Sequence, residues 1–148
     1  MESRCVLVVE DEPMVRTMLE VALKRWGFNT VSSKDESEAQ EQLKSGLRPC
    51  LILMNLNLAR MKAHAFREWQ RQHPELRQTP VIVLSGGGLP EQMRDELQAA
   101  GYLSKPINFP ALRALLAEHC PSELRTGEPS PNPRRNWGGL PRVLITGR

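Results

Sequence analysis

Five polar residues of this sequence could do chemistry together, because each follows an apolar run at a corresponding place. Glu10 and Asp11 follow the run CVLVV, Asn55 follows CLILM, Ser85 follows VIVL, and Lys105 comes just after YLS. Carboxylates suit a hard divalent cation, and a lysine supplies fixed positive charge to a phosphate group. The set is typical of a site that handles phosphate, except that Asn55 is a neutral amide.

The apolar runs predict strands that alternate with helices. Continuous apolar runs indicate strands buried on both faces, and apolar residues at helical spacing indicate amphipathic helices. The expected strands are 5–9, 28–31, 50–54, 81–84 and 102–104. The expected helices lie at 13–26, 35–45, 63–72 and 109–120, with a further helix that carries Met93, Leu97 and Ala100 on its inner face.

This alternation predicts an α/β fold with a parallel sheet and helices on both faces. Such sheets place their sites beyond the carboxyl ends of the strands, at the point where the strand order reverses. The polar residues that follow the apolar runs should therefore meet at one edge of the sheet.

Charge and composition divide the chain of 148 residues into two parts. Residues 1–120 are balanced in charge, whereas residues 121–148 hold five arginines and two glutamates and account for the net charge of +3. The second part also holds five of the twelve prolines, which predicts a flexible tail after a domain at 1–120. A dispersed charge of this size makes nucleic-acid binding unlikely.

No apolar run approaches the ~20 residues of a membrane span, and the N-terminus is too polar for a secretory signal, so we expect a cytoplasmic protein.

Three cysteines, Cys5, Cys50 and Cys120, include no close pair. An odd, widely spaced set argues against a disulfide framework.

The pieces VLVVEDEP, LILMNLNL, VIVLSGG and YLSKP together resemble the receiver domain of bacterial two-component response regulators over roughly residues 4–120. Position 55 comes 44 residues after Asp11, and Ser85 comes 30 residues after position 55, as in that family. The resemblance implies a flavodoxin-like, doubly wound sheet of five parallel strands in the order 2-1-3-4-5.

The resemblance also implies roles for individual residues. Glu10 and Asp11 match the acids that hold Mg²⁺, and the backbone carbonyl of Asn57 would be a third ligand. Ser85 and Lys105 match the residues that contact the phosphoryl group. Two further features follow: the Lys105–Pro106 bond would be cis, and Tyr102 matches the aromatic side chain that rotates on activation.

Position 55 departs from the family pattern, where an aspartate accepts the phosphoryl group. An amide cannot form the acyl phosphate. Asn55 also removes an anionic ligand, so Mg²⁺ should bind weakly. The change should relieve repulsion among the acids, and Lys105 would then face Glu10 or Asp11 without competition. The loop after Asn57 also lacks the family's glycines, which indicates drift away from phosphotransfer.

Plainer interpretations stay open for three of these features. The acids after the first strand could be a helix N-terminal cluster. Ser85 could be a turn former before three glycines, and Tyr102 a partly buried strand residue rather than a switch.

Three functions remain. The first is an atypical receiver that docks a histidine kinase, a phosphotransfer protein or another regulator without being phosphorylated, and this is the one we favour; it would not be an enzyme. The second is a conventional phosphoacceptor receiver in which Asn55 is an introduced replacement for aspartate, or in which another carboxylate such as Asp11 is used. The third is an adaptor whose basic tail binds an acidic partner or nucleic acid. A homodimer is left open in each case.

Overall fold

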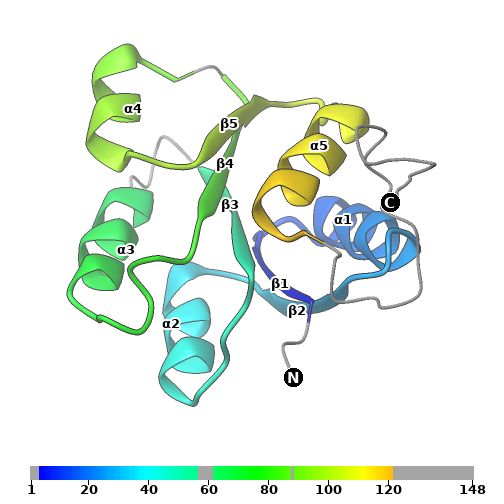
Figure 1. Cartoon of the computed structure of the whole chain (residues 1–148). Helices are drawn as coiled ribbons and strands as arrows, with labels where there is room; N and C mark the ends of the chain where they lie inside the picture. The colour runs from blue at the N-terminus through cyan, green and yellow to red at the C-terminus, as the bar shows by residue number, and fades with distance from the viewer. Residues whose placement is uncertain (1–3, 57–61, 88, 122–148) are drawn as a thin grey trace, which may run out of the picture.

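The computed structural model describes residues 4–56, 62–87 and 89–121, and in this part of the chain strands and helices alternate (Figure 1). The strands are β1 (Cys5–Val9), β2 (Asn29–Ser33), β3 (Leu51–Leu56), β4 (Val81–Ser85) and β5 (Gly101–Ser104). The helices are α1 (Pro13–Arg25), α2 (Glu36–Lys44), α3 (Lys62–Arg71), α4 (Glu91–Leu97) and α5 (Phe109–His119).

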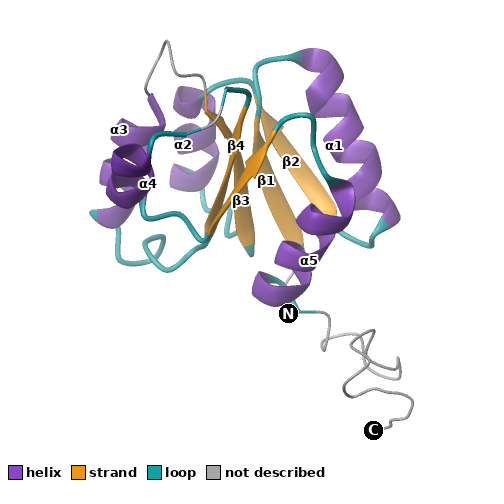
Figure 2. Cartoon of the chain, turned by 90° about the horizontal axis from the view of Figure 1, so that it is seen from above, coloured by secondary structure: helices purple, strands orange, loops and turns teal. Residues whose placement is uncertain are grey.

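The strands form one parallel sheet in the order β2-β1-β3-β4-β5. Figure 2 shows α1 and α5 on one face of this sheet and α2, α3 and α4 on the other. The strand order reverses between β1 and β3, so the carboxyl ends of these two strands border the expected position of a site. The predicted α/β fold and its strand order are confirmed.

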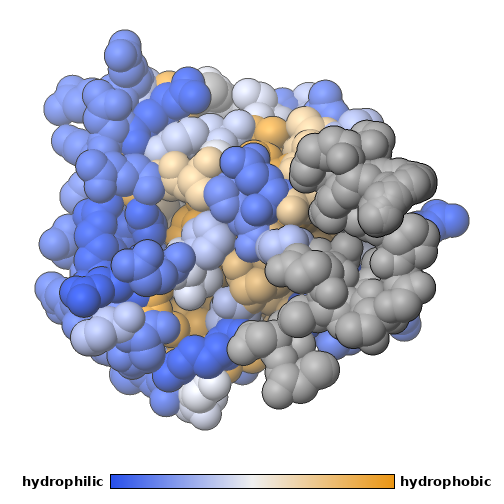
Figure 3. All heavy atoms as spheres, in the orientation of Figure 1, coloured by the Kyte–Doolittle hydropathy of each residue, from blue (hydrophilic) through white to orange (hydrophobic). Residues whose placement is uncertain are grey.

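The sheet separates two apolar clusters. In β1, Val6 and Val8 pack toward α1 and α5, whereas Leu7 and Val9 pack toward α2 and α3. These four side chains are at most 3% exposed, which explains why the strand is apolar at every position. Figure 3 shows hydrophilic side chains on the outer faces of α3 and α4, at the left of the view, with apolar surface nearer the sheet.

Local signals in the sequence account for several helix ends. Pro13 is the first residue of α1, and Gly27 and Gly46 follow α1 and α2 with positive φ angles of 93° and 114°. The Asp35 side chain accepts a hydrogen bond of 2.8 Å from the Glu38 backbone N–H at the start of α2. Glu38 in turn accepts from the backbone N–H of Lys34 at 2.7 Å, one residue before the N-cap that a regular capping box would reach.

Several element boundaries differ from the prediction. The strand β3 continues to Leu56, two residues beyond the predicted end, so Asn55 lies inside the strand rather than after it. The helix α4 ends at Leu97, because Gln98 adopts the left-handed conformation with φ 50°, and Ala100 is exposed rather than inward. The Ala100 backbone N–H instead donates to Val81 O at 2.8 Å and begins the ladder between β4 and β5. The second strand runs from Asn29 to Ser33, two residues beyond the predicted end.

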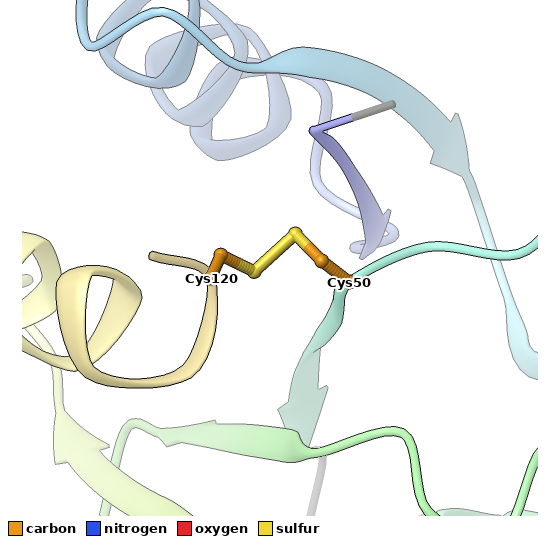
Figure 4. Close-up of a disulfide and its surroundings, with 2 residues drawn as sticks. All are labelled: Cys50 and Cys120. Atoms are coloured by element: carbon orange, nitrogen blue, oxygen red, sulfur yellow. A yellow bond between two sulfur atoms is a disulfide. The ribbon is translucent and has the colours of Figure 1, made fainter. Parts of the chain in front are cut away.

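The expectation that the cysteines form no disulfide is wrong. Cys50 and Cys120 are bonded across 70 residues of sequence, with their Cα atoms 5.7 Å apart (Figure 4). Sequence spacing fails here because α5 runs back across the sheet and ends beside the start of β3. Cys5 is a free, buried cysteine.

None of the described helices is long and apolar enough to span a membrane.

Candidate functional site

The predicted site residues lie at the carboxyl ends of neighbouring strands. Asn55 pairs with Leu84 near the end of β3, and Ser85, the last residue of β4, pairs with Ser104 of β5. Lys105 follows directly, and its backbone N–H donates to Ser85 O at 2.9 Å. A pocket opens at this edge beside β1 and β3. Its lining residues are Val9, Glu10, Asp11, Lys34, Asp35, Glu36 and Asn55.

Glu10 is the most enclosed acid of the site, with 1% of its surface exposed. Its backbone N–H donates to Ser33 O at 3.0 Å, and its carbonyl accepts from the Arg16 guanidinium at 2.8 Å. Its carboxylate Oε2 accepts from the Glu12 backbone N–H at 3.1 Å. Burial raises the pKa of this carboxyl, although the Glu12 N–H and the charge of Lys105 act in the opposite direction.

Lys105 faces Glu10, as the replacement at position 55 predicts. Its Nζ lies 3.6 Å from Glu10 Oε1, and its side chain is 23% exposed. The Lys105–Pro106 peptide bond is cis, which confirms the prediction. The carboxylate thus keeps a cation beside it in a pocket that excludes much of the water.

Asn55 occupies the strand end that the phosphoacceptor would occupy. Its Nδ2 points toward Asp11 Oδ1 at 3.5 Å, a long contact for a hydrogen bond. Its Oδ1 is buried and accepts no hydrogen bond from the described residues. The opposite orientation of the amide would place this oxygen against the Asp11 carboxylate, so electrostatics favour the observed one.

The remaining predicted residues divide into two groups. Ser85 is buried, with 5% exposure, and lies at the edge of the sheet where the resemblance places a phosphate contact. Tyr102 lies away from the pocket: its hydroxyl donates to Arg94 O at 2.7 Å and accepts from the Ala99 N–H at 2.9 Å. Asn57 falls outside the described residues.

One wall of the pocket was missed from the sequence. Lys34, Asp35 and Glu36 follow β2 and line the pocket together with Asn55. Glu36 Oε1 is buried and has no hydrogen-bond donor among the described residues. The signal in the sequence is the position of these residues just after the short second strand, at the same edge of the sheet as Glu10 and Asn55.

The pocket offers oxygen atoms that suit a hard divalent cation. Glu10 Oε1 and Asn55 Oδ1 are both buried without a hydrogen-bond donor in the described part of the chain, and Asp11 lies beside them. No group of three or more Asp, Glu, His or Cys residues is gathered closely enough in that part to hold a metal ion. Glu10, Asp11 and Asn55 together offer two carboxylates and a neutral amide, which suit Mg²⁺ with less negative charge than three carboxylates would give.

Comparison with known proteins assigns the family. The family model described as "Response regulator receiver domain" matches residues 6–117. The response regulator protein PilR of Pseudomonas aeruginosa is 32% identical over 120 residues, which cover 79% of this chain and 26% of PilR. The chain thus spans about a quarter of that relative's length. The polar-differentiation response regulator DivK of Brucella anthropi is 27% identical, with 72% of this chain and 88% of DivK covered.

Solved structures with the same fold agree. The chemotaxis protein CheY4 of Vibrio cholerae superimposes with a TM-score of 0.71 and 26% identity, covering 80% of this chain and 99% of CheY4. The receiver domain of the sensor histidine kinase PA1611 of Pseudomonas aeruginosa gives a TM-score of 0.69 and 26% identity, covering 80% and 98%. That receiver was solved with a magnesium ion coordinated in its active site cleft. The chain described here belongs to the response regulator receiver domain family, whose members are signalling modules of two-component systems rather than typical enzymes.

Proposed function

We propose that this receiver domain acts without phosphorylation at position 55, by docking to another protein of a two-component pathway. The observation that carries the proposal is Asn55 itself, which lies at the strand end beside Asp11. Acyl phosphate formation needs a carboxylate oxygen as the nucleophile, and an amide does not supply one.

The same residue weakens the case for tight magnesium binding. Glu10 and Asp11 would hold the ion, with the Asn55 oxygen as a neutral ligand and the Asn57 carbonyl as the ligand implied by family resemblance. Bound Mg²⁺ would neutralise negative charge on a phosphoryl group. Because position 55 contributes no charge, we propose that the site binds Mg²⁺ weakly.

Lys105 and Ser85 remain at the phosphate-contact positions, but the lysine is already engaged. Its ammonium group lies 3.6 Å from the Glu10 carboxylate. An incoming anion would have to compete with this buried carboxylate for the lysine. The Glu10–Lys105 pair therefore favours a single conformation of the domain that needs no phosphoryl group.

An exposed apolar stripe on α1 supports docking. Met14, Met18 and Val21 are 75%, 47% and 56% exposed and lie at helical positions i, i+4 and i+7. Residues at this spacing share one face of a helix. We propose that this face of α1 contacts a histidine kinase, a phosphotransfer protein or another regulator.

The docking proposal is tested with purified histidine kinases and phosphotransfer proteins of the same organism. Each is immobilised, and the chain is passed over it with and without a small phosphodonor and Mg²⁺. We expect one partner to bind with the same Kd in both conditions, and Met18→Glu to weaken this binding at least about tenfold. Glu41→Lys, an exposed change on α2, is the matched control. Binding that appears only after phosphodonor treatment would contradict the proposal.

A second candidate is a conventional phosphoacceptor receiver in which Asn55 is an introduced replacement for aspartate. The buried Ser85 at the end of β4 and Lys105 just after β5 favour it, because both residue types suit contact with a phosphoryl group. Under this candidate, Asn55→Asp would restore phosphorylation. The function of the protein would then depend on that phosphorylation.

A further inference from the structure

The Cys50–Cys120 disulfide lies at the end of the sheet opposite the pocket. Cys50 directly precedes β3, whose other end carries Asn55, and Cys120 follows the last residue of α5. Figure 4 shows the bond joining the end of α5 to the segment that enters β3. A change at this bond therefore acts on α5 and on the chain that follows it, at a distance from the pocket.

Packing shows what the bond holds in place. Leu112, Leu116 and Cys120 are buried in the same apolar cluster as Leu51 and Leu53 of β3. The Cys120 backbone N–H donates to Leu116 O at 2.6 Å and closes the last turn of α5. An isolated helix of eleven residues is marginal in water. The last turn of α5 thus depends on its attachment to β3.

The two cysteine residues differ in exposure. Cys50 is half-buried, whereas Cys120 is 3% exposed. A small thiolate therefore reaches the sulfur of Cys50 more readily than that of Cys120. Attack at Cys50 forms a mixed disulfide and releases Cys120 as a thiolate, which takes a proton from water.

The third cysteine lies beside this bond but is buried. Cys5 is 5% exposed and belongs to neither apolar cluster, and its backbone carbonyl accepts a hydrogen bond of 2.8 Å from the Cys50 N–H. Burial also raises the pKa of the Cys5 thiol, which keeps it protonated and a poor nucleophile. Burial and the raised pKa both disfavour Cys5 as a competitor for the pair, and the variant Cys5→Ala tests this.

We propose that Cys50–Cys120 is a reversible thiol–disulfide exchange site for small dithiols, and that its reduction releases the last turn of α5 while the sheet and the pocket stay in place. In the complete step, one thiol of the dithiol attacks Cys50 and the second resolves the mixed disulfide. The protein gains two thiols, and the dithiol becomes a cyclic disulfide. The site couples the thiol balance of the surroundings to the α5 surface, independently of the proposed docking function.

The test compares the oxidised and dithiol-reduced full-length protein by hydrogen–deuterium exchange at labelling times under about a minute. We expect peptides covering 113–120 to exchange at least about tenfold faster after reduction, with 51–56 and 81–85 protected in both states. The variant Cys5→Ala should behave like the parent. The double variant Cys50→Ala, Cys120→Ala should match the reduced parent, and an added small disulfide should restore slow exchange only in chains that keep both cysteines.

Three results would overturn the proposal. Unchanged exchange at 113–120 would mean that the bond does not hold α5. Fast exchange throughout the sheet would mean that the bond supports the whole fold rather than one turn. A bond that a small dithiol opens only in denaturant would not be an exchange site under native conditions.

Discussion

At the scale of single residues, the charges and polar contacts of four residues stabilise the site: Glu10, Lys105, Asp11 and Asn55. Two carboxylates stand side by side at the end of β1, and the neutral amide spares them a third negative charge. Asn55 Nδ2 faces Asp11, and Lys105 Nζ faces Glu10. Each acid therefore has a partner of favourable charge or polarity, which is how a pocket with a buried acid can be stable without a phosphoryl group.

The Glu10–Lys105 pair is open to a double-mutant cycle. Lys105→Met leaves the Glu10 carboxylate buried beside an apolar group, so we expect the free energy of unfolding to fall by roughly 2 kcal/mol at neutral pH. Glu10→Gln in the Lys105→Met background should recover most of this loss, because no buried charge remains. Denaturant unfolding measures all four proteins. Additive effects of the two changes would show that the residues do not interact.

The raised pKa of Glu10 predicts a pH dependence of stability. A folded-state pKa above the unfolded value of about 4.3 means that the folded protein binds this proton more tightly. The stability that comes from protonating Glu10 in the folded state is fully present below the unfolded-state pKa. It is lost as the pH rises through the folded-state pKa. Glu10→Gln should therefore gain stability relative to the parent as the pH rises above about 4.3, measured by urea unfolding in buffer free of divalent cations. Parallel curves for the two proteins would contradict the assignment.

At the scale of elements, α3 holds the end of α4. Arg67 is buried and donates to Leu97 O and Gln98 O, each at 2.8 Å, and to Gln70 Oε1 at 2.7 Å. Tyr102 donates to Arg94 O from the neighbouring strand. Carbonyl groups at a helix C-terminus lack partners within the helix, and a cation also suits the helix dipole. This arrangement fixes α4 beside the sheet without any contribution from the pocket.

Removing the arginine tests this element directly. Arg67→Met keeps the apolar stem but removes the guanidinium donor from Gln98 O and from Gln70 Oε1, and it leaves Leu97 O with only the 3.2 Å contact from Arg71. We expect a loss of about 3 kcal/mol in the free energy of unfolding. Arg71→Met, which loses only contacts of 3.2 Å to Glu96 O and Leu97 O and an ion pair with Glu68, should cost less than about 1 kcal/mol. Equal losses of unfolding free energy in the two variants would show that the buried hydrogen bonds of Arg67 stabilise the protein no more than the exposed contacts of Arg71.

The sequence predicted the elements better than the contacts between them. Apolar runs and capping signals located the strands, and strand ends brought Glu10, Asn55 and Lys105 together. The end of α4 was missed because Gln98, not a glycine, adopts the left-handed conformation. The Arg67 network and the Cys50–Cys120 bond join residues far apart in sequence, and neither periodicity nor spacing carries information about such pairs.

At the scale of the whole molecule, the described apolar clusters lie entirely between Cys5 and Cys120. We propose that residues 1–120 form the folding unit, because the proline-rich and arginine-rich composition of 121–148 is typical of a tail.

Truncation tests this division of the chain. A protein that ends at Pro121 should keep its melting temperature within about 2 °C of the full-length chain, which is about 0.5 kcal/mol. A protein that ends at Ala114 loses Leu116 and Cys120 from the core and should unfold at a clearly lower temperature. Calorimetry distinguishes them. A large loss in the longer truncation would show that the tail contributes to the fold.

The central claim is that position 55 accepts no phosphoryl group, although the residues around it remain in place. Intact mass, measured after incubation with a small phosphodonor and Mg²⁺, tests this claim in the parent chain and in Asn55→Asp. The account predicts an unmodified parent and a variant that gains one phosphoryl group. A parent chain that itself gains an acid-stable, base-labile phosphoryl group would contradict it, because another carboxylate would then be the acceptor.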